Sequence, residues 1–486
     1  MHRREILYVL TAALAANLAF PTLARAQKTA ATPIQYVVVI FNENNSFDHY
    51  FGTYPNAANP PGDPQFTALP NTPSVNGLTP SLIANNPNST KPFRIPRSTE
   101  MLCDNDNHYA DEQKAYHAGL LDKFPESTNG TGCPAANVMG YYDGNTVTAL
   151  WNYAQHFAIS DYFFDTEFGT TVMGHLNLIS GQTHQTGVNS IAGKIVNGSI
   201  IANVEAGFDD CTGVTPVKMT GKNVGDLLNA AGVTWGWFYD SFARTGVKSD
   251  GTATCNSVYN NHYDPFQYYA STSNPHHLPP GSPDMIGQTD QANHQYDLKD
   301  FWTAAIYGTL PAVSFIKFQS ANTGHPADST ALAEQRYLVE TINALQRLPQ
   351  WPKMAILITY DDSDGWYDHV MPPIVSQSND AANDTLMGAG LCGTPTVEGA
   401  YLDRCGYGAR LPFVVISPFA RQNFVSSTLN DTSSILRFIE DNWNLGRIGD
   451  QSFDAMAGSF MDMFNFGGPP APQVFLDPQT GLVVNQ

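Results

Sequence analysis

Basic residues are scarce in this chain of 486 residues, which has 24 lysines and arginines against 44 aspartates and glutamates. No run of Lys or Arg is present to form a basic patch, which argues against binding to nucleic acid phosphates or anionic membranes. The sequence has neither a His-Glu-x-x-His motif nor a Cys-x-x-Cys pair, so it gives no support to a zinc protease or a dithiol redox site. No repeat with a period of about 20 to 50 residues occurs, which argues against a solenoid or propeller.

The N-terminus carries an apolar stretch from Ile6 to Phe20, preceded by Arg3-Arg4 and followed by Ala24-Arg25-Ala26. This pattern is typical of a secretory signal peptide and is too short for a membrane span. The arginine pair leaves the twin-arginine export route open. Removal of residues 1–26 would leave 21 basic and 43 acidic residues, a net charge of −22. We therefore expect a periplasmic or secreted protein without an integral membrane segment.

Cysteines are few, but their number is even. There are six of them, and in an exported chain disulfides are their usual use. Pairing in sequence order closes the shortest loops, although it is one of about 15 possible connectivities. The expected pairs are 103 with 133, 211 with 255, and 392 with 405.

Five apolar runs predict strands buried on both faces, since they are continuous and do not alternate with polar residues. Helix-like stretches lie between them, which predicts an α/β fold with a mostly parallel central sheet and helices on both faces. We expect one catalytic domain, residues 27–486, with long insertions at 54–96 and 241–290 that cover a site. The predicted strands are 36–41, 234–239, 312–318, 354–360 and 411–417, and the predicted helices are 111–124, 223–232, 331–348 and 432–445.

Acidic and amide side chains directly follow two of these strands. Glu43 and Asn44 follow the first run, and Asp361 and Asp362 follow the run that ends at Tyr360. Functional groups gather at the carboxyl ends of parallel strands, and oxygen ligands of this kind suit a hard divalent cation. The competing interpretation is that these residues cap a helix and stabilise turns.

Seven ordered sequence blocks resemble one bacterial phosphoesterase family, which holds the non-haemolytic phospholipases C and the acid phosphatases of the AcpA type. The blocks are NENNSFDHYFG, FGTTVMGHLNLISGQTH, YDPFQYYASTSNPHH, ANHQYDLKDFW, LPAVSFIKF, YDDSDGWYDHV and GYGARLPFVVISPFAR. The resemblance runs from residue 36 to about residue 445. It implies an alkaline-phosphatase-like fold and phosphoryl transfer through a covalent intermediate on the enzyme.

The resemblance also implies roles for individual residues. The family nucleophile aligns with Thr171, with Thr170 as the alternative one residue earlier. A divalent cation of unknown identity, held by Glu43, Asn44, Thr171, Asp361 and Asp362, would activate the threonine hydroxyl. Three histidines are expected to bind phosphate oxygens and protonate the leaving group. They are His108, for which Asn107 is the alternative, His262 and His325, whereas His294 and His369 are expected to orient the aspartates.

Two phosphoesterase functions follow from the resemblance. The chain ends soon after the catalytic blocks, which favours a broad-specificity acid phosphatase that hydrolyses phosphate monoesters through a phosphothreonine. The alternative is a phospholipase C that cleaves phosphatidylcholine-like diesters. The expected partner is a small phosphoester or a phospholipid, with no nucleic acid, and the oligomeric state stays open. A third hypothesis is a non-catalytic cation-binding protein. The presence of Thr171, the expected nucleophile, argues against it.

Overall fold

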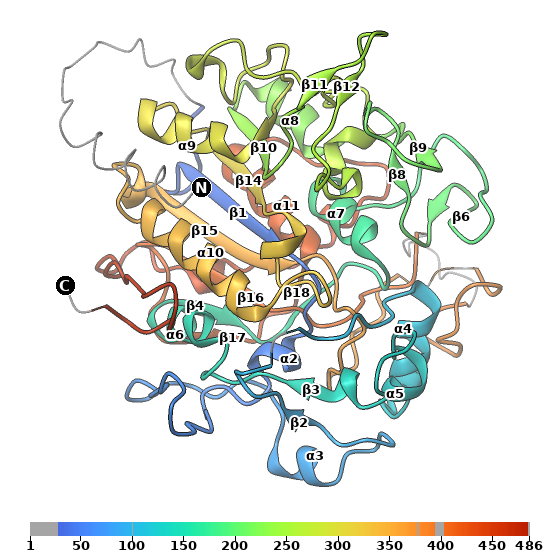
Figure 1. Cartoon of the computed structure of the whole chain (residues 1–486), viewed down its shortest axis with the longest axis vertical. Helices are drawn as coiled ribbons and strands as arrows, with labels where there is room; N and C mark the ends of the chain where they lie inside the picture. The colour runs from blue at the N-terminus through green and yellow to red at the C-terminus, as the bar shows by residue number, and fades with distance from the viewer. Residues whose placement is uncertain (1–27, 100, 377, 379, 394–402, 485–486) are drawn as a thin grey trace.

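The computed structural model describes residues 28–99, 101–376, 378, 380–393 and 403–484. The predicted signal peptide therefore lies outside the described residues. An eight-stranded sheet runs through the molecule in the order β13-β10-β14-β1-β15-β16-β4-β17 (Figure 1). Its strands are β1 (Tyr36–Asn42), β4 (Ala158–Ser160), β10 (Trp235–Tyr239), β13 (Gln295–Asp297), β14 (Val313–Lys317), β15 (Met354–Tyr360), β16 (Phe413–Ile416) and β17 (Phe424–Ser426).

The sheet is mostly parallel, as the sequence predicts. Strand β1 pairs in parallel with β14 and β15, and β10 pairs in parallel with β13 and β14. Strand β16 runs antiparallel to both of its neighbours, β15 and β4. All five predicted runs form strands of this sheet within two residues of their predicted ends. The three strands that were not predicted are three residues long, too short to give a clear apolar run.

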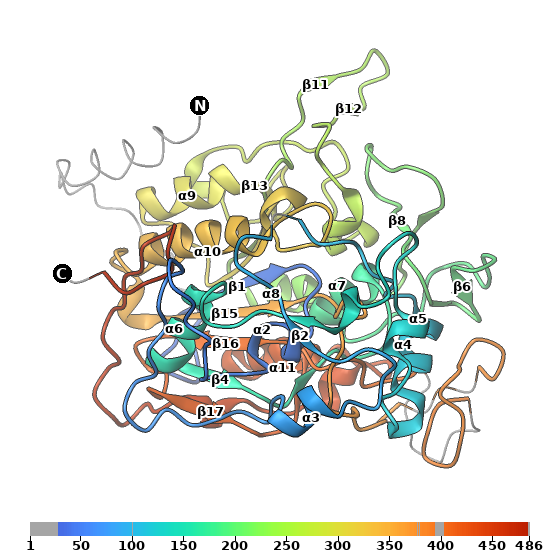
Figure 2. The ribbon, with the colours of Figure 1, turned by 60° about the horizontal axis from the view of Figure 1, so that its bottom comes forward.

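Helices cover both faces of the sheet. Figures 1 and 2 show α9 and α10 on one face, while α7, α8 and α11 lie together on the other, where they contact one another. The helices are α2 (Phe47–Phe51), α3 (Pro80–Ala84), α4 (Tyr109–Tyr116), α5 (Phe124–Ser127), α6 (Thr148–His156), α7 (Thr171–Ser180), α8 (Val224–Ala231), α9 (Leu298–Tyr307), α10 (Ala331–Leu345) and α11 (Thr432–Trp443). Within the described ranges, no helix combines the length and apolar character needed to cross a bilayer.

The predicted helices differ from the observed ones mainly at one C-terminus. The helix expected at 111–124 ends at Tyr116 as α4, because His117 and Ala118 have positive φ angles of 42° and 54°, and α5 begins only at Phe124. A left-handed residue ends an α-helix. The other three predicted helices are α8, α10 and α11, each within three residues of its expected ends.

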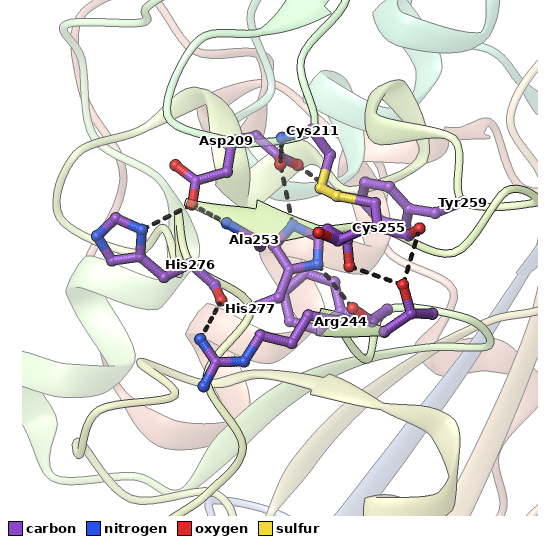
Figure 3. Close-up of a disulfide and its surroundings, with 12 residues drawn as sticks. Asp209, Cys211, Arg244, Ala253, Cys255, Tyr259, His276 and His277 are labelled. Carbon is purple, nitrogen blue, oxygen red and sulfur yellow. Dashed lines mark hydrogen bonds and ion pairs between the residues drawn. A yellow bond between two sulfur atoms is a disulfide. The ribbon is translucent and has the colours of Figure 1, made fainter. Parts of the chain in front are cut away.

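All three predicted disulfides are present, and they pair the cysteines in sequence order. The Cys211–Cys255 bridge ties the insertion at 241–290 to the segment before β9 (Pro216–Val217) (Figure 3). Beside it, the buried carboxylate of Asp209 accepts hydrogen bonds from Tyr259 Oη at 2.6 Å and His277 Nε2 at 2.9 Å. These contacts fix an insertion that has little regular structure of its own.

The remaining strands form two-stranded ribbons outside the main sheet. The ribbon of β11 and β12 lies within the insertion at 241–290, whereas β2, at the end of the insertion at 54–96, pairs with β3 outside it. The short strands are β2 (Phe93–Arg94), β3 (Gly140–Tyr141), β5 (Phe163–Phe164), β6 (Ile195–Val196), β7 (Ser199–Ile200), β8 (Glu205–Ala206), β9, β11 (Gly246–Val247), β12 (Ala253–Thr254) and β18 (Asn430–Asp431).

Candidate active site

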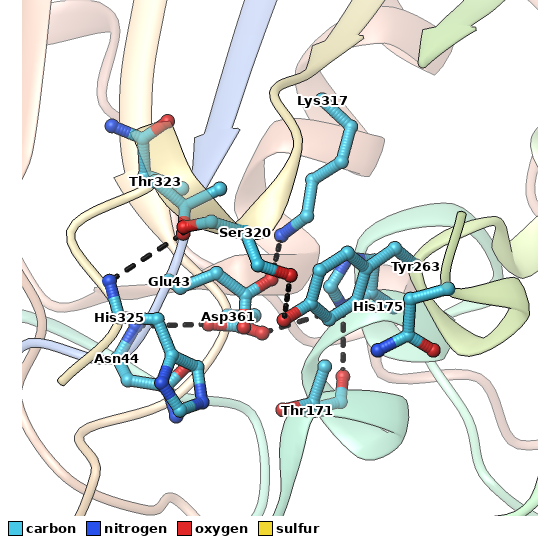
Figure 4. Close-up of polar contacts among 12 residues, drawn as sticks. Glu43, Asn44, Thr171, His175, Tyr263, Lys317, Ser320, Thr323, His325 and Asp361 are labelled. Carbon is cyan, nitrogen blue, oxygen red and sulfur yellow. Dashed lines mark hydrogen bonds and ion pairs between the residues drawn. The ribbon is translucent and has the colours of Figure 1, made fainter. Parts of the chain in front are cut away.

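The acidic residues that follow β1 and β15 meet at one edge of the sheet. The two strands are parallel neighbours, and their last residues, Asn42 and Tyr360, are paired in register. The chains therefore leave the sheet side by side, and the backbone N–H of Asn44 donates to Asp361 Oδ1 at 3.1 Å. Figure 4 shows Glu43, Asn44 and Asp361 in this common cluster.

A buried lysine adds positive charge to this cluster. Lys317, the last residue of β14, donates from Nζ to Glu43 Oε1 (Figure 4). Its ammonium also lies 4.5 Å from the ring centroid of Tyr263, and the lysine is fully buried. Lys317 was not predicted as a site residue from the sequence. The signal was a charged residue at the end of a buried apolar strand, the same rule that selected the carboxylates.

The donor set fits a divalent cation. Among the described residues, Glu43 Oε2, Asn44 Oδ1 and Asp361 Oδ2 are buried without a hydrogen-bond partner. Burial raises the pKa of the Asp361 carboxyl well above its usual value, and the charge of Glu43 raises it further. Buried oxygens of this kind are costly unless a cation or donor satisfies them. Glu43, Asn44 and Asp361, with Asp362 beside them, are therefore able to hold a hard cation.

Thr171 lies against this cluster at the start of a helix. It is the first residue of α7, and Thr171 Oγ1 donates to Asp362 Oδ2 at 3.4 Å. The helix approaches closely because Gly174 has no side chain: a Cβ there would lie 1.9 Å from the carbonyl oxygen of Asp361. The hydroxyl of the alternative residue, Thr170, is buried and has no hydrogen-bond partner. A helix N-terminus also favours an anionic ligand such as a phosphate.

His175 is a further site residue that the sequence analysis missed. It lies one turn after Thr171 on α7, and its Nδ1 is 2.8 Å from the Thr171 carbonyl oxygen and 3.5 Å from Asp361 Oδ2. Burial lowers the pKa of its imidazole well below the usual value. Its ring stacks on that of Tyr263 with centroids 5.8 Å apart. The available signal was the spacing of four residues from Thr171, which places both side chains on one helix face.

Two of the three predicted histidines lie near the cluster. His325 has Nδ1 2.6 Å from the carbonyl oxygen of Pro326, and it groups with the carboxylates of Asp104 and Asp364. His262 pairs its Nε2 with the amide nitrogen of Asn260 at 2.9 Å. His262 also lies near enough to His175 to contribute to the lowered pKa of that imidazole, after burial and Lys317.

The third predicted histidine lies elsewhere. The His108 side chain is 65% exposed, and its Nδ1 pairs with Asp106. Its neighbour Asn107, the alternative at this position, donates from Nδ2 to Asp362 Oδ2 at 3.0 Å. The structure thus brings Asn107, and not the imidazole of His108, into contact with the carboxylates.

Asp364, His294 and His369 make other contacts, and only the two histidines were expected to orient the aspartates. Asp364 has a φ of 53°, as suits a turn, but its carboxylate also accepts from Asn44 Nδ2 at 3.2 Å. His369 pairs its Nδ1 with Asp48 at 2.6 Å, and His294 pairs its Nδ1 with the carbonyl oxygen of Trp235 at 2.9 Å. Neither imidazole therefore orients the site aspartates through these bonds.

Comparison with known proteins identifies a family and several relatives of this chain. The family model described as "Phosphoesterase family" matches residues 34–446. The chain is 28% identical to the non-hemolytic phospholipase C of Burkholderia pseudomallei, over 96% of this chain and 65% of that protein. It is 24% identical to phospholipase C A of Mycobacterium tuberculosis, over 97% of this chain and 86% of that protein. The chain thus spans less than two thirds of the length of the Burkholderia protein.

A solved structure gives a weaker match. It is described as a protein in the alkaline phosphatase superfamily from Vibrio parahaemolyticus, and it aligns with 10% identity and a TM-score of 0.33. The alignment covers 92% of this chain and 78% of that one. The α/β assignment rests on the sheet and helices described above.

Proposed function

Because the chain belongs to the Phosphoesterase family, we propose that it is a phosphoesterase of the phospholipase C kind, acting on phosphatidylcholine-like phosphodiesters. The two relatives described above are both named phospholipase C. They support this alternative better than the acid phosphatase expected from the sequence, which is not confirmed. The three disulfides fit an exported enzyme.

One observation carries the proposal: the Thr171 hydroxyl lies 3.4 Å from Asp362 Oδ2 at the edge of a buried anionic cluster. In the proposed reaction, Thr171 Oγ attacks phosphorus while its proton passes to Asp362. The bond from phosphorus to the diacylglycerol oxygen breaks, and that oxygen takes a proton from His325 or His262. Water then cleaves the phosphoryl ester on Thr171, which releases phosphocholine and restores the hydroxyl.

The other site residues prepare this chemistry. A divalent cation held by Glu43, Asn44, Asp361 and Asp362 would acidify the Thr171 hydroxyl and offset the charge of the phosphoryl oxygens. Lys317 holds Glu43 in place within the cluster.

The test compares p-nitrophenylphosphorylcholine with p-nitrophenyl phosphate as substrates for the purified protein. We expect faster turnover of the choline diester, because both relatives are named phospholipase C. In Thr171→Ala, kcat should fall by about 10⁴-fold or more. Mass spectrometry of wild type that is acid-quenched during turnover of the choline diester should find a phosphocholine adduct on Thr171.

Thr170→Ala is the matched control, since it removes the neighbouring hydroxyl, and its kcat should stay within about threefold of wild type. Turnover of the monoester alone would return the assignment to an acid phosphatase. An inactive Thr170→Ala beside an active Thr171→Ala would move the nucleophile by one residue. Absence of turnover on both substrates would overturn the proposed function.

A further inference from the structure

Glu112 is a buried carboxylate that the proposed chemistry does not use. It lies on α4, outside the main sheet, and its side chain is almost completely buried at 3% exposure. Burying a carboxylate is costly unless hydrogen bonds or a cation satisfy it. The buried carboxylate of Glu112 is therefore expected to accept hydrogen bonds from specific donors.

Its two oxygens accept hydrogen bonds from two different segments of the site. Glu112 Oε2 accepts from the backbone N–H of Gly169 at 3.0 Å, two residues before Thr171. Glu112 Oε1 accepts from Ser363 Oγ at 2.5 Å, one residue after Asp362. The carboxylate therefore bridges the segment that carries the nucleophile and the segment that carries the aspartates.

The bridged segments have defined conformations. Gly169 has a φ of 133°, a region that favours glycine, and a Cβ there would lie 2.4 Å from Met173 Sδ. On the other side, Ser363 Oγ accepts from the Gly365 N–H at 3.1 Å, which fixes the serine. Helix α4 makes a second contact with the same region through Tyr116, whose ring lies 5.5 Å from that of Phe168.

We propose that Glu112 is a positioning residue, which holds the Thr171 segment at its working distance from the Asp361–Asp362 segment. The Thr171–Asp362 hydrogen bond joins the same two segments. It has a length of 3.4 Å and gives little restraint of its own. Since a displacement of about 1 Å at a reacting group can cost about 10²-fold in rate, the bridge acts on turnover. This inference rests on the proposed function.

The test compares Glu112→Ala with Glu112→Gln. Alanine removes both hydrogen bonds, and kcat should fall by about ten- to hundredfold while KM changes by less than about threefold. Glutamine restores the bridge, because its amide oxygen accepts from Gly169 and its amide NH₂ donates to Ser363. Its kcat should return to within about threefold of wild type.

Gln113→Ala is the matched control on the same helix. Gln113 is also fully buried, but its Oε1 accepts from the backbone N–H groups of Thr385 and Leu386 at 2.9 and 3.1 Å. Its loss should lower the melting temperature and leave kcat within about threefold of wild type. Equal losses of kcat in Gln113→Ala and Glu112→Ala, or a Glu112→Gln variant as slow as alanine, would overturn the proposal.

Two further measurements keep the test decisive. Amide hydrogen exchange at residues 168–174 should speed up in Glu112→Ala and not in Gln113→Ala, and unchanged exchange would overturn the proposal. This readout needs no substrate, so it still decides the role of Glu112 if the wild type hydrolyses no phosphoester.

Ser363→Ala replaces Glu112→Ala if that variant does not fold, because it removes the hydrogen bond at the other end of the bridge. The kcat of Ser363→Ala should fall by about three- to tenfold. Unchanged turnover in this variant would overturn the proposal.

Discussion

At the scale of single residues, burial and hydrogen-bond partners separate the candidate groups. Asp362 receives hydrogen bonds from Thr171 and Asn107, whereas the imidazole of His108 faces Asp106 and solvent. Burial is the main cause that raises the pKa of the Asp362 carboxyl well above its usual value. The negative charges of Asp361 and Glu112 raise this pKa further. The amide of Asn107 offsets part of this cost, because it donates to the charged form.

We predict that Asn107→Ala lowers kcat by about tenfold or more, since a hydrogen bond to a charged group contributes about 1.5 to 3 kcal/mol. His108→Ala should stay within about threefold of wild type, because its side chain is 65% exposed. Steady-state kinetics with the choline diester measures both. If Asn107→Ala keeps the wild-type kcat and His108→Ala is inactive, His108 is the catalytic group and the prediction is wrong.

At the scale of elements, strand register and helix approach bring the site together. A second buried carboxylate, Glu334 on α10, fastens the ends of β1 and β15. Its Oε1 accepts from Asn42 Nδ2 at 2.7 Å and from Tyr360 Oη at 2.5 Å, which are the last residues of the two strands. On the opposite face, α7 reaches the same strand ends because Gly174 allows close contact with the Asp361 backbone.

Gly174→Ala should therefore destabilise the fold by about 1 to 3 kcal/mol, because overpacking forces the helix away from the strand end. The same shift should lower kcat, since it moves Thr171. Gly467→Ala is the control, as a Cβ there meets nothing within 4 Å. Denaturant unfolding measures the free energies, and equal stability of the two variants would contradict the close approach.

At the scale of the whole molecule, ionic contacts join segments that are distant in the sequence. His184 Nδ1 lies 3.0 Å from Asp403 Oδ2, and the same carboxylate accepts from Ser199 Oγ and Thr183 N. Burial alone would lower the pKa of His184, but the hydrogen bond and charge of Asp403 outweigh it and raise that pKa to about 9. Burial would likewise raise the pKa of Asp403, but His184 leads the contacts that lower it to about 2.

This pair predicts a pH-dependent contribution to stability. The raised pKa of His184 stabilises the folded state fully below about pH 6.5, and this contribution is lost as the pH rises through about 9. The difference in free energy of unfolding between wild type and His184→Gln should therefore be large at pH 6 and small at pH 10.

His276→Gln is the control for this measurement, because it makes the same chemical change at an ion pair whose imidazole is 54% exposed. At pH 6, His276→Gln should lower the free energy of unfolding less than His184→Gln does, since exposed ion pairs contribute little to stability. A difference for His184→Gln that does not vary with pH would contradict the assigned pair.

The sequence by itself determined the features that depend on local pattern. The buried strands follow from continuous apolar runs, and the acidic edge of the sheet follows from the residues directly after two of them, Glu43 and Asp361. The sequence favoured the disulfide pairing in chain order without determining it, because this pairing is one of about 15 connectivities, and the structure confirms it.

Only the tertiary structure decided which polar groups meet at that edge. Asn107 and Asp362 are 255 residues apart in the sequence, and Glu112 and Ser363 are 251 apart. Lys317 and Glu43 join β14 to β1 over 274 residues. No local propensity distinguishes Asn107, Glu112 or Ser363 from exposed neighbours such as His108. Their contacts arise because parallel strands and the packing of α4 and α7 bring distant segments to the same edge of the sheet.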